Sequence, residues 1–350
     1  MMIANEGVRR PPGPRRLVFA GEAIVDVVMR VPVLPRRGGD VLATSAEILA
    51  GGGFNVMAAA ARQGLPVLYA GGHGTGPWGE VVRAALAAEG IGLLRPADPD
   101  RDTGFDVALV DADAERTFVT RLGAETVPGP GAWDAVLAGP GDAVYVSGYG
   151  LVPPESGPAL GDWAAALPPD ALLFFDPGPL VAQIPAAVLH PVLSRCDWLS
   201  CNHREADLLA RTLVAGPEAA AMGDAGSGDA GSGDAGPGPV VRGDPGQVAR
   251  RLLARGSAAN VIVRAGAAGC YVAELGSAAA VHVRAPQVTA VDTTGAGDAH
   301  SGVFLAALAD GHSPAGAAAR ANAAAAFAVT RPGPATAPDR AQLDAWLSAR

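Results

Sequence analysis

Apolar segments of strand length recur along this chain, and most of them are followed by a segment with helical character. The clearest runs are DAVYVSG, ALLFFDPG, DWLSCN and ANVIVRAG, and we interpret residues 16–31 as a first buried strand. Helices are expected over Asn55–Gln63 and Gly79–Ala88, each followed by a glycine that can end it, Gly64 or Gly90. This alternation predicts a three-layer α/β/α sandwich with a mostly parallel central sheet.

Four segments stand outside this alternation. Residues 104–122 contain two alternating apolar–polar runs around a short polar turn, which predicts a β-hairpin apart from the central sheet. Residues 41–50 are expected to form a further strand. Residues 1–15 are predicted to be a disordered tail, and 222–240, which repeats GSGDA, a mobile low-complexity insertion. We expect a single domain over residues 16–350.

Composition excludes several kinds of protein. All 26 basic residues are arginines, so no Walker-A lysine, no protein-kinase strand lysine and no lysine Schiff base is available. The formal net charge of −9 and the lack of a basic stripe argue against a nucleic-acid partner. No apolar run approaches the ~20 residues of a membrane span, so no membrane partner is expected. The cysteines Cys196, Cys201 and Cys270 show no disulfide or zinc spacing, which favours a cytoplasmic location.

One glycine-rich segment, Gly74-Thr-Gly-Pro-Trp-Gly79, fits the GxGxxG pattern of a dinucleotide site and opens a helix. Pro77 and Trp78 occupy the positions where the backbone would approach a pyrophosphate. The nearby acids, Asp98 and Asp100, fall in a loop rather than at a strand end. We therefore interpret this segment as a structural turn.

A second glycine-rich segment, Asp292-Thr-Thr-Gly-Ala-Gly-Asp298, leads directly into an apolar helix. Its small residues allow the amides of Gly295, Ala296 and Gly297 to converge at the helix N-terminus, where free N–H groups and the helix dipole bind anions. Asp298 lies in the first turn, where a carboxylate can cap the helix or accept a proton from a hydroxyl. An anion hole beside a base is most of what phosphoryl transfer requires.

The segment DTTGAGDAHSG resembles the C-terminal signature of the ribokinase-like (PfkB) carbohydrate kinases, which use no Walker lysine. Five other segments resemble the family's remaining motifs in the same order, from about residue 16 onward. They are GEAIVD (21–26), a strand ending in a sugar-binding Asp; AGGGFNVMAAAARQG (50–64), a glycine-rich segment; Asn202-His-Arg-Glu205, the N-x-x-E element; RAGAAG (264–269), a glycine turn at the nucleotide; and RANAAAAFAVTRPG (320–333), the helix and loop at the adenine and cation sites.

The resemblance implies a ribokinase-like fold with a small β-sheet lid, and transfer of the γ-phosphoryl group of ATP to a sugar hydroxyl. It makes Asp298 the catalytic base and gives the anion hole to the amides of residues 295–297. It implies that Glu205 and Asn202 orient hydrated Mg²⁺ and the phosphates, which is chemically reasonable because Mg²⁺ keeps several waters and needs few protein ligands.

The resemblance also assigns three sets of binding residues. The nucleotide set comprises Asn202, Arg264, Gly266, Gly269 and Asn322. The set for a monovalent cation, K⁺ in relatives that use one, comprises Asp292, Thr294 and carbonyls of the loop from Arg331 to Gly333. The sugar set comprises Asp26, Gly52, Gly53 and Asn55.

The strands at 41–50 and 104–122 match the family's lid, which closes over the sugar and forms a homodimer interface in many relatives. Gly52 stands where ribose-specific relatives commonly carry a lysine, which counts against ribose.

The expected activity is an ATP-dependent sugar kinase. The alternatives are a nucleoside kinase or a sugar-phosphate kinase of the same fold, and a non-catalytic sugar-sensing protein. A sugar-phosphate kinase would need cations for the second phosphate, for which the candidates are Arg36, Arg37, Arg116 and Arg121.

Overall fold

The computed structural model describes residues 13–113, 115–126, 131–220, 243–256 and 258–350, without the side chains of 214–220. The predicted insertion at 222–240 and residues 1–12 of the predicted tail lie outside these ranges. No helix within them is both long and apolar enough to cross a lipid bilayer. The helices are α1 (Phe54–Arg62), α2 (Pro77–Ala88), α3 (Gly157–Ala165), α4 (Ala186–Arg195), α5 (His203–Ala220), α6 (Pro245–Ala254), α7 (Ala296–Ala309), α8 (Pro314–Ala328) and α9 (Arg340–Ser348).

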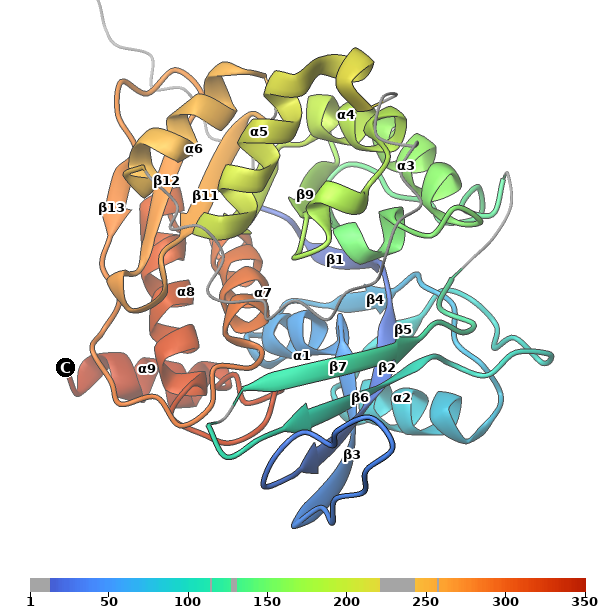
Figure 1. Cartoon of the computed structure of the whole chain (residues 1–350). Coiled ribbons are helices and arrows are strands. Elements are labelled where there is room, and N and C mark those ends of the chain that lie inside the picture. The colour runs from blue at the N-terminus through green and yellow to red at the C-terminus, as the bar shows by residue number, and fades with distance from the viewer. Residues whose placement is uncertain (1–12, 114, 127–130, 221–242, 257) are drawn as a thin grey trace, which may run out of the picture.

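The larger of two sheets forms the centre of the molecule (Figure 1). Its strands are parallel from β5 through β11, and β12 and β13 extend it as antiparallel strands. In spatial order they are β13 (Val281–Val283), β12 (Cys270–Glu274), β11 (Asn260–Arg264), β10 (Trp198–Asn202), β9 (Leu172–Asp176), β8 (Asp142–Ser147), β1 (Arg16–Ala20), β4 (Val67–Tyr69) and β5 (Gly92–Leu93).

Helices cover both faces of this sheet, and the side chains of β1 show how the two layers form. Val18 and Ala20 point into a core shared with α3, α4, α5 and α6. Leu17 and Phe19, which alternate with them, point into a second core shared with α1, α2, α7 and α8. Both faces of the strand are therefore buried, as expected for a parallel sheet between two helical layers. The predicted three-layer α/β/α fold is confirmed.

A smaller sheet stands apart from the central one and consists of β3 (Ser45–Gly52), β2 (Ala23–Arg30), β6 (Phe105–Val110) and β7 (Arg116–Arg121), in that order. We call it the lid sheet. Asp26 is paired with Leu49 on β3 and with Asp106 on β6, and Asp106 is paired with Thr120 on β7. Because paired residues share a face, these four side chains belong to one side of the lid sheet.

The structure corrects two of the expected strands. The run over 16–31 is two strands, since the chain leaves the central sheet at Gly21 and Glu22 and enters the lid sheet at Ala23. Asp26 therefore lies in the middle of a lid strand rather than at the end of a central one. The strand expected over 41–50 begins only at Ser45, opposite Arg30, where its partner β2 ends, and it continues to Gly52.

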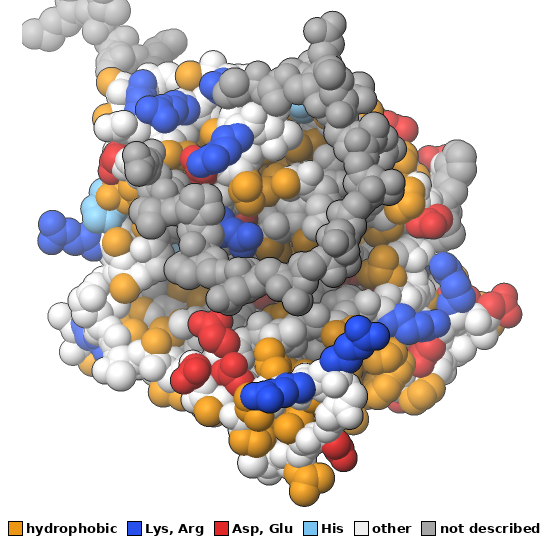
Figure 2. Space-filling view, in the orientation of Figure 1, with side chains coloured by type: hydrophobic (Ala, Val, Ile, Leu, Met, Phe, Trp, Pro, Cys, Tyr) orange, Lys and Arg blue, Asp and Glu red, His pale blue; other side chains and the backbone are white. Residues whose placement is uncertain are grey.

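The face of the lid sheet that carries Asp26 and Asp106 is turned toward a cavity, whereas the opposite face is partly packed on α2 through Trp78 and Phe105. On that opposite face Ile48 and Val119 are 53% and 67% exposed. Figure 2 shows hydrophobic side chains exposed among arginines over the part of the molecule where Figure 1 places this sheet.

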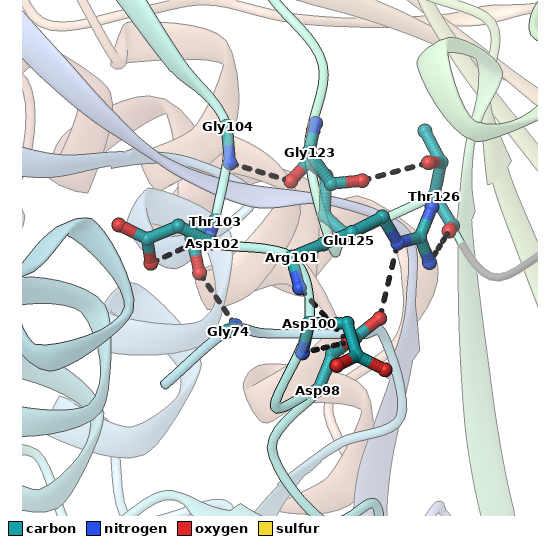
Figure 3. A network of polar contacts seen from close by, with 10 residues as sticks. All are labelled: Gly74, Asp98, Asp100, Arg101, Asp102, Thr103, Gly104, Gly123, Glu125 and Thr126. Atoms are coloured by element: carbon teal, nitrogen blue, oxygen red, sulfur yellow. Dashed lines mark hydrogen bonds and ion pairs between the residues drawn. The ribbon is translucent and has the colours of Figure 1, made fainter. Parts of the chain in front are cut away.

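The base of the β6–β7 hairpin is held by one buried carboxylate (Figure 3). Glu125 accepts a hydrogen bond from the amide of Gly104, just before β6, at 2.7 Å, and another from the amide of Gly123, just after β7, at 2.6 Å. A Cβ atom on Gly104 would lie 2.3 Å from Glu125 Oε1, so only glycine lets the carboxylate come this close. Glu125 therefore ties the two ends of the hairpin together.

We expect Glu125→Ala to lower the free energy of unfolding by about 2–6 kcal/mol, because two amides would lose their partner at roughly 1–3 kcal/mol each. Urea denaturation followed by circular dichroism measures the change. Glu115→Ala, at the exposed tip of the same hairpin, is the matched control and should leave the stability unchanged. Equal stability of the two variants would contradict the role given to Glu125.

Candidate active site

A cavity of about 630 Å³ lies between the carboxyl ends of the central strands and the lid sheet. Four polar side chains that line it follow or end neighbouring parallel strands: Glu22 after β1, Ser147 on β8, Asp176 on β9 and Arg264 on β11. The sheet order reverses between β1 and β8, and ligands of open α/β sheets bind at such a point, outside the carboxyl ends of the strands. The cavity is therefore in the position where this architecture places a ligand.

Asp298 reaches the cavity from the first turn of α7. Its Oδ2 accepts a hydrogen bond from Asn55 Nδ2 on α1 at 3.1 Å. The two helices approach closely at Gly302, where a Cβ atom would lie 2.4 Å from the carbonyl oxygen of Val56. Burial raises the pKa of Asp298 to about 6, although the hydrogen bond from Asn55 acts in the opposite direction.

The N-terminus of α7 is open toward ligand. Gly295, the N-cap of α7, is in the left-handed conformation, and among the described residues no side chain accepts a hydrogen bond from the amides of Gly297 or Asp298. Of the amides predicted for the anion hole, that of Ala296 donates to the carbonyl of Thr293 at 3.3 Å. Helix dipole and free amides thus remain available for an anion. Thr294 and Asp298, on either side of this turn, both line the cavity.

The other glycine-rich helix start, at α2, is filled by the protein itself. Asp102 accepts hydrogen bonds from the amides of Trp78 at 3.0 Å and Gly79 at 2.8 Å, which is where a phosphate would bind. Gly76 is required for this approach, because its Cβ atom would lie 2.4 Å from the Asp102 carboxylate. Figure 3 shows the same loop held further by Thr103, whose hydroxyl accepts from the amide of Gly74. Residues 74–79 thus form a turn and the first residues of α2, with Asp102 at the helix N-terminus.

Arg264, predicted at the nucleotide, lies between two carboxylates with its side chain 14% exposed. Its Nη1 donates to Asp176 at 2.7 Å, and its Nη2 lies 3.6 Å from Glu205. Burial opposes the charged guanidinium, but Asp176 and Glu205 outweigh it and raise the pKa of Arg264. Glu205 in turn accepts from the amide of Asn202 at 2.8 Å, and Asn202 Oδ1 accepts from the amide of Glu205 at 2.9 Å. Arg264 thus neutralises much of the charge at this end of the cavity.

The opposite wall presents unpartnered hydrogen-bond acceptors. Glu22 Oε2, Asn55 Oδ1 and Asp106 Oδ1 are buried and have no partner among the described residues, whereas Glu22 Oε1 accepts from Ser147 at 3.1 Å. Burial raises the pKa of Glu22 to about 8 and that of Asp106 to about 6. Burial and the neighbouring Asp106 raise the pKa of Asp26 to about 7. This wall is suited to a ligand that brings hydroxyl groups.

Asp26 lies against Gly51, which directly precedes the two glycines predicted near the sugar. A Cβ atom on Gly51 would lie 2.0 Å from Asp26 Oδ1, so the carboxylate lies directly over Gly51. Gly52 has a φ of 59°, and Gly53 packs against the ring of Phe19. The structure brings Asp26, Gly52 and Gly53 to the cavity together with Asn55.

The residues predicted at a monovalent cation lie beside the open turn of α7. Asp292 accepts hydrogen bonds from the amides of Thr294 at 2.8 Å and Gly333 at 3.1 Å, and it forms an ion pair with Arg116 of the lid sheet. Arg331, predicted to contribute a carbonyl here, places its guanidinium over the ring of Phe327, 3.4 Å from the centroid. The charge of Asp292 is thus already balanced by an arginine of this chain.

The remaining nucleotide candidates lie around the β11–β12 connection and do not line the cavity. Gly266 faces open space, while a Cβ atom on Gly269 would lie 2.1 Å from the carbonyl oxygen of Val283. Asn322 is buried and donates to that same carbonyl at 2.8 Å. The geometry of Gly269 and Asn322 accounts for contacts within the protein, and their predicted nucleotide contacts stay predictions.

Sequence reasoning did not identify Glu22, Asp106, Ser147 or Asp176 as site residues. Glu22 and Asp176 follow or end apolar strand segments, and a polar residue at the carboxyl end of a parallel strand is a signal that could have found them. Asp106 lies inside an alternating strand, and its place beside Asp26 depends on parallel pairing of β2 with β6. No local pattern contains that information.

Comparison with known proteins matches residues 14–340 to the pfkB family carbohydrate kinase model. The chain belongs to the PfkB family of carbohydrate kinases. It is 30% identical over 329 residues to the uncharacterized sugar kinase YegV of Escherichia coli (strain K12), which covers 93% of this chain and 92% of the relative. As a member of this family it is a phosphotransferase that uses an alcohol group as acceptor.

Two solved structures share the fold. Ribokinase from Thermotoga maritima superposes with a TM-score of 0.76 at 21% identity, over 95% of this chain and 99% of that one. Arabidopsis thaliana ribokinase complexed with ribose and ATP superposes with a TM-score of 0.68 at 20% identity, over 96% and 99%. Both likenesses confirm the ribokinase-like architecture of this PfkB family member.

Proposed function

We propose that this PfkB kinase transfers the γ-phosphoryl group of ATP to a hydroxyl of a small neutral carbohydrate, with Asp298 as general base. The observation that carries the proposal is the open N-terminus of α7 at the cavity, with Asp298 in its first turn. The attacking hydroxyl oxygen bonds to the γ-phosphorus, the bond from that phosphorus to the β–γ bridging oxygen breaks, and ADP leaves. The hydroxyl proton passes to Asp298, and the amides at the turn stabilise charge on the transferring group.

We assign hydrated Mg²⁺ to the Glu205 end of the cavity. Glu205 lines the cavity with Asp176 and Arg264, and carboxylates are the ligands that Mg²⁺ prefers. One carboxylate is sufficient, because the ion keeps several waters and binds the phosphates of the substrate. Bound there, Mg²⁺ would neutralise phosphate charge, while Arg264 and Asn202 hold Glu205 in place.

The charges around the cavity favour a neutral acceptor over a sugar phosphate. Arg264 is the basic residue among its described lining residues, and it is already paired with Asp176 and Glu205. Acids dominate the rest of the lining: Glu22, Asp26, Asp106, Glu125 and Asp298. The arginines considered for a second phosphate lie elsewhere, because Arg36 and Arg37 are exposed in the loop before β3, Arg116 pairs with Asp292, and Arg121 is exposed at the end of β7.

A screen of ADP release over pentoses, hexoses, ketoses, their phosphates and nucleosides tests the proposal. We expect turnover with at least one neutral sugar and none with its phosphate at the same concentration, because the phosphate would face the unpartnered carboxylate of Asp106, which stays ionised at neutral pH with a pKa of about 6. A sugar phosphate as the best acceptor would contradict the assignment of a neutral substrate. The absence of turnover with every acceptor would favour a sugar-sensing role.

A nucleoside kinase is the second candidate, because the cavity reaches beyond the carboxylate wall to Trp133, Tyr149 and Leu180, where a base could pack.

We further propose that the exposed lid face with Ile48 and Val119 is a homodimer interface. A cytoplasmic setting is supported by the three cysteines, which are all free and buried.

A further inference from the structure

One ion pair joins the lid sheet to the loop that precedes α7. Arg116 begins β7, and Asp292 lies 176 positions further along the chain, yet Arg116 Nη2 donates directly to Asp292 Oδ1. The two side chains are only 21% and 7% exposed. In Figure 1 the hairpin end at which β7 begins lies beside the loops that lead into α7 and away from α8.

Arg116 lies on the face of the lid sheet that is turned toward the active site. It is paired with Val110 across β6–β7 and shares its side of the strand with Phe118 and Thr120, which line the main cavity. Arg121, five positions later on the same strand, points to the opposite face. The strand thus offers one arginine that reaches Asp292 and one that cannot.

Asp292 also binds the turn before α7, which is the proposed anion hole. The oxygen that accepts from Arg116 also accepts from the amide of Thr294, one residue before Gly295. The other oxygen accepts from the amide of Gly333, in the loop after α8. The Asp292 carboxylate therefore connects Arg116 of the lid sheet to two backbone segments beside the anion hole, one at Thr294 and one at Gly333.

The lid and the loops leave a space beside the ion pair. A second cavity of about 110 Å³ separates the lid from the loops here, lined by Arg30, Glu47, Arg116, Asp292 and Gly333 among others. The ion pair therefore bridges a space that is lined by polar and apolar side chains alike, with Val110 and Phe118 among the apolar ones. Hydrogen bonds and the charge of Arg116 lower the pKa of Asp292 despite its burial, so the pair is ionised at neutral pH.

We propose that Arg116 is a positioning residue, which locks the lid onto the Asp292–Asp298 loop and supplies there the positive charge that a monovalent cation would otherwise provide. The inference rests on the proposed function, in which this loop forms the anion hole. It departs from the K⁺ site that the sequence suggested, because the guanidinium already balances Asp292.

Hydrogen–deuterium exchange tests the lock without any substrate. In the full-length protein, Arg116→Met should speed exchange of amides in β6, β7 and residues 292–298 by about 10- to 100-fold, the factor that hydrogen bonds to charged groups typically contribute. Arg121→Met, the matched control on the other face, should leave these rates unchanged, and Arg116→Lys should restore part of the protection. If amide exchange in Arg116→Met is as slow as in the wild type, the proposal is overturned, and this result does not depend on which reaction the protein catalyses.

Kinase assays in K⁺ or tetramethylammonium at equal ionic strength test the second part. The wild type should turn over equally in both salts, and Arg116→Met should lose kcat with little change in the KM for ATP. K⁺ should then restore part of the lost kcat, because the vacated cavity beside Asp292 can accept a cation. A wild-type enzyme that requires K⁺ would overturn the charge-replacement role, and the exchange result would still report on the lock.

Discussion

Replacement of Asp298 by Asn is expected to lower kcat by about 10²- to 10⁴-fold, the range that general acid–base catalysis typically contributes. Asparagine has nearly the same shape, and its oxygen can still accept the hydrogen bond from Asn55 that holds the side chain. The variant should bind MgADP with unchanged affinity, because the amides of the turn remain. Steady-state assays with the acceptor found in the screen, and calorimetry with MgADP, measure the two quantities.

The pH dependence of kcat/KM is a second test of Asp298 as the general base. The raised pKa of about 6 means that Asp298 becomes protonated, and unable to accept a proton, as the pH falls through that value. Wild-type kcat/KM should therefore fall below about pH 6, and Asp298→Asn should lose the part of this fall that comes from Asp298, while the part that comes from Asp106, whose pKa is also raised to about 6, remains. Asp310→Asn, at the exposed other end of α7, is the matched control and should behave as the wild type. Wild-type turnover in Asp298→Asn would mean that a different group takes the proton.

Local patterns in the sequence predicted the central architecture well. Apolar runs of strand length followed by helices specify a parallel sheet, since both faces of each strand must be buried, as Val18 and Phe19 are. The same reasoning failed at Gly21, where one apolar run crosses from the central sheet to the lid sheet. Hydrophobicity records that both strands are buried, and it carries no information on which partner each one pairs with.

The site residues that lie together in one short segment could be predicted from the sequence. The site residues that come together from distant segments could not. Asp298 and its turn lie within seven consecutive residues, so the pattern identified them. Asp106 joins Asp26 only through the pairing of β2 with β6, and Arg116 meets Asp292 only across the gap between lid and loop. The two helix starts with similar glycines differ because Asp102 caps α2 from another loop, which sequence spacing does not show.

Gly295→Ala is expected to lower kcat by about 10²- to 10³-fold, the effect of losing a preorganised donor at developing charge. Gly295 has a φ of 71°, and a Cβ atom there would lie 2.1 Å from the carbonyl oxygen of Pro334. Because that atom belongs to the backbone, the turn before α7 or the loop after α8 must move. Movement of the turn displaces the amides of the anion hole from Asp298, so kcat should fall while the protein stays folded.

Gly311→Ala separates this clash from the cost of the left-handed conformation. Gly311 follows the other end of α7 with a φ of 83°, and nothing lies within 4 Å of the position its Cβ would take. Alanine there costs about 1–2 kcal/mol of stability through backbone conformation alone. We expect both variants to lose stability in thermal denaturation and only Gly295→Ala to lose kcat. Equal kcat in the two variants would show that the glycine serves folding of the turn rather than the geometry of the anion hole.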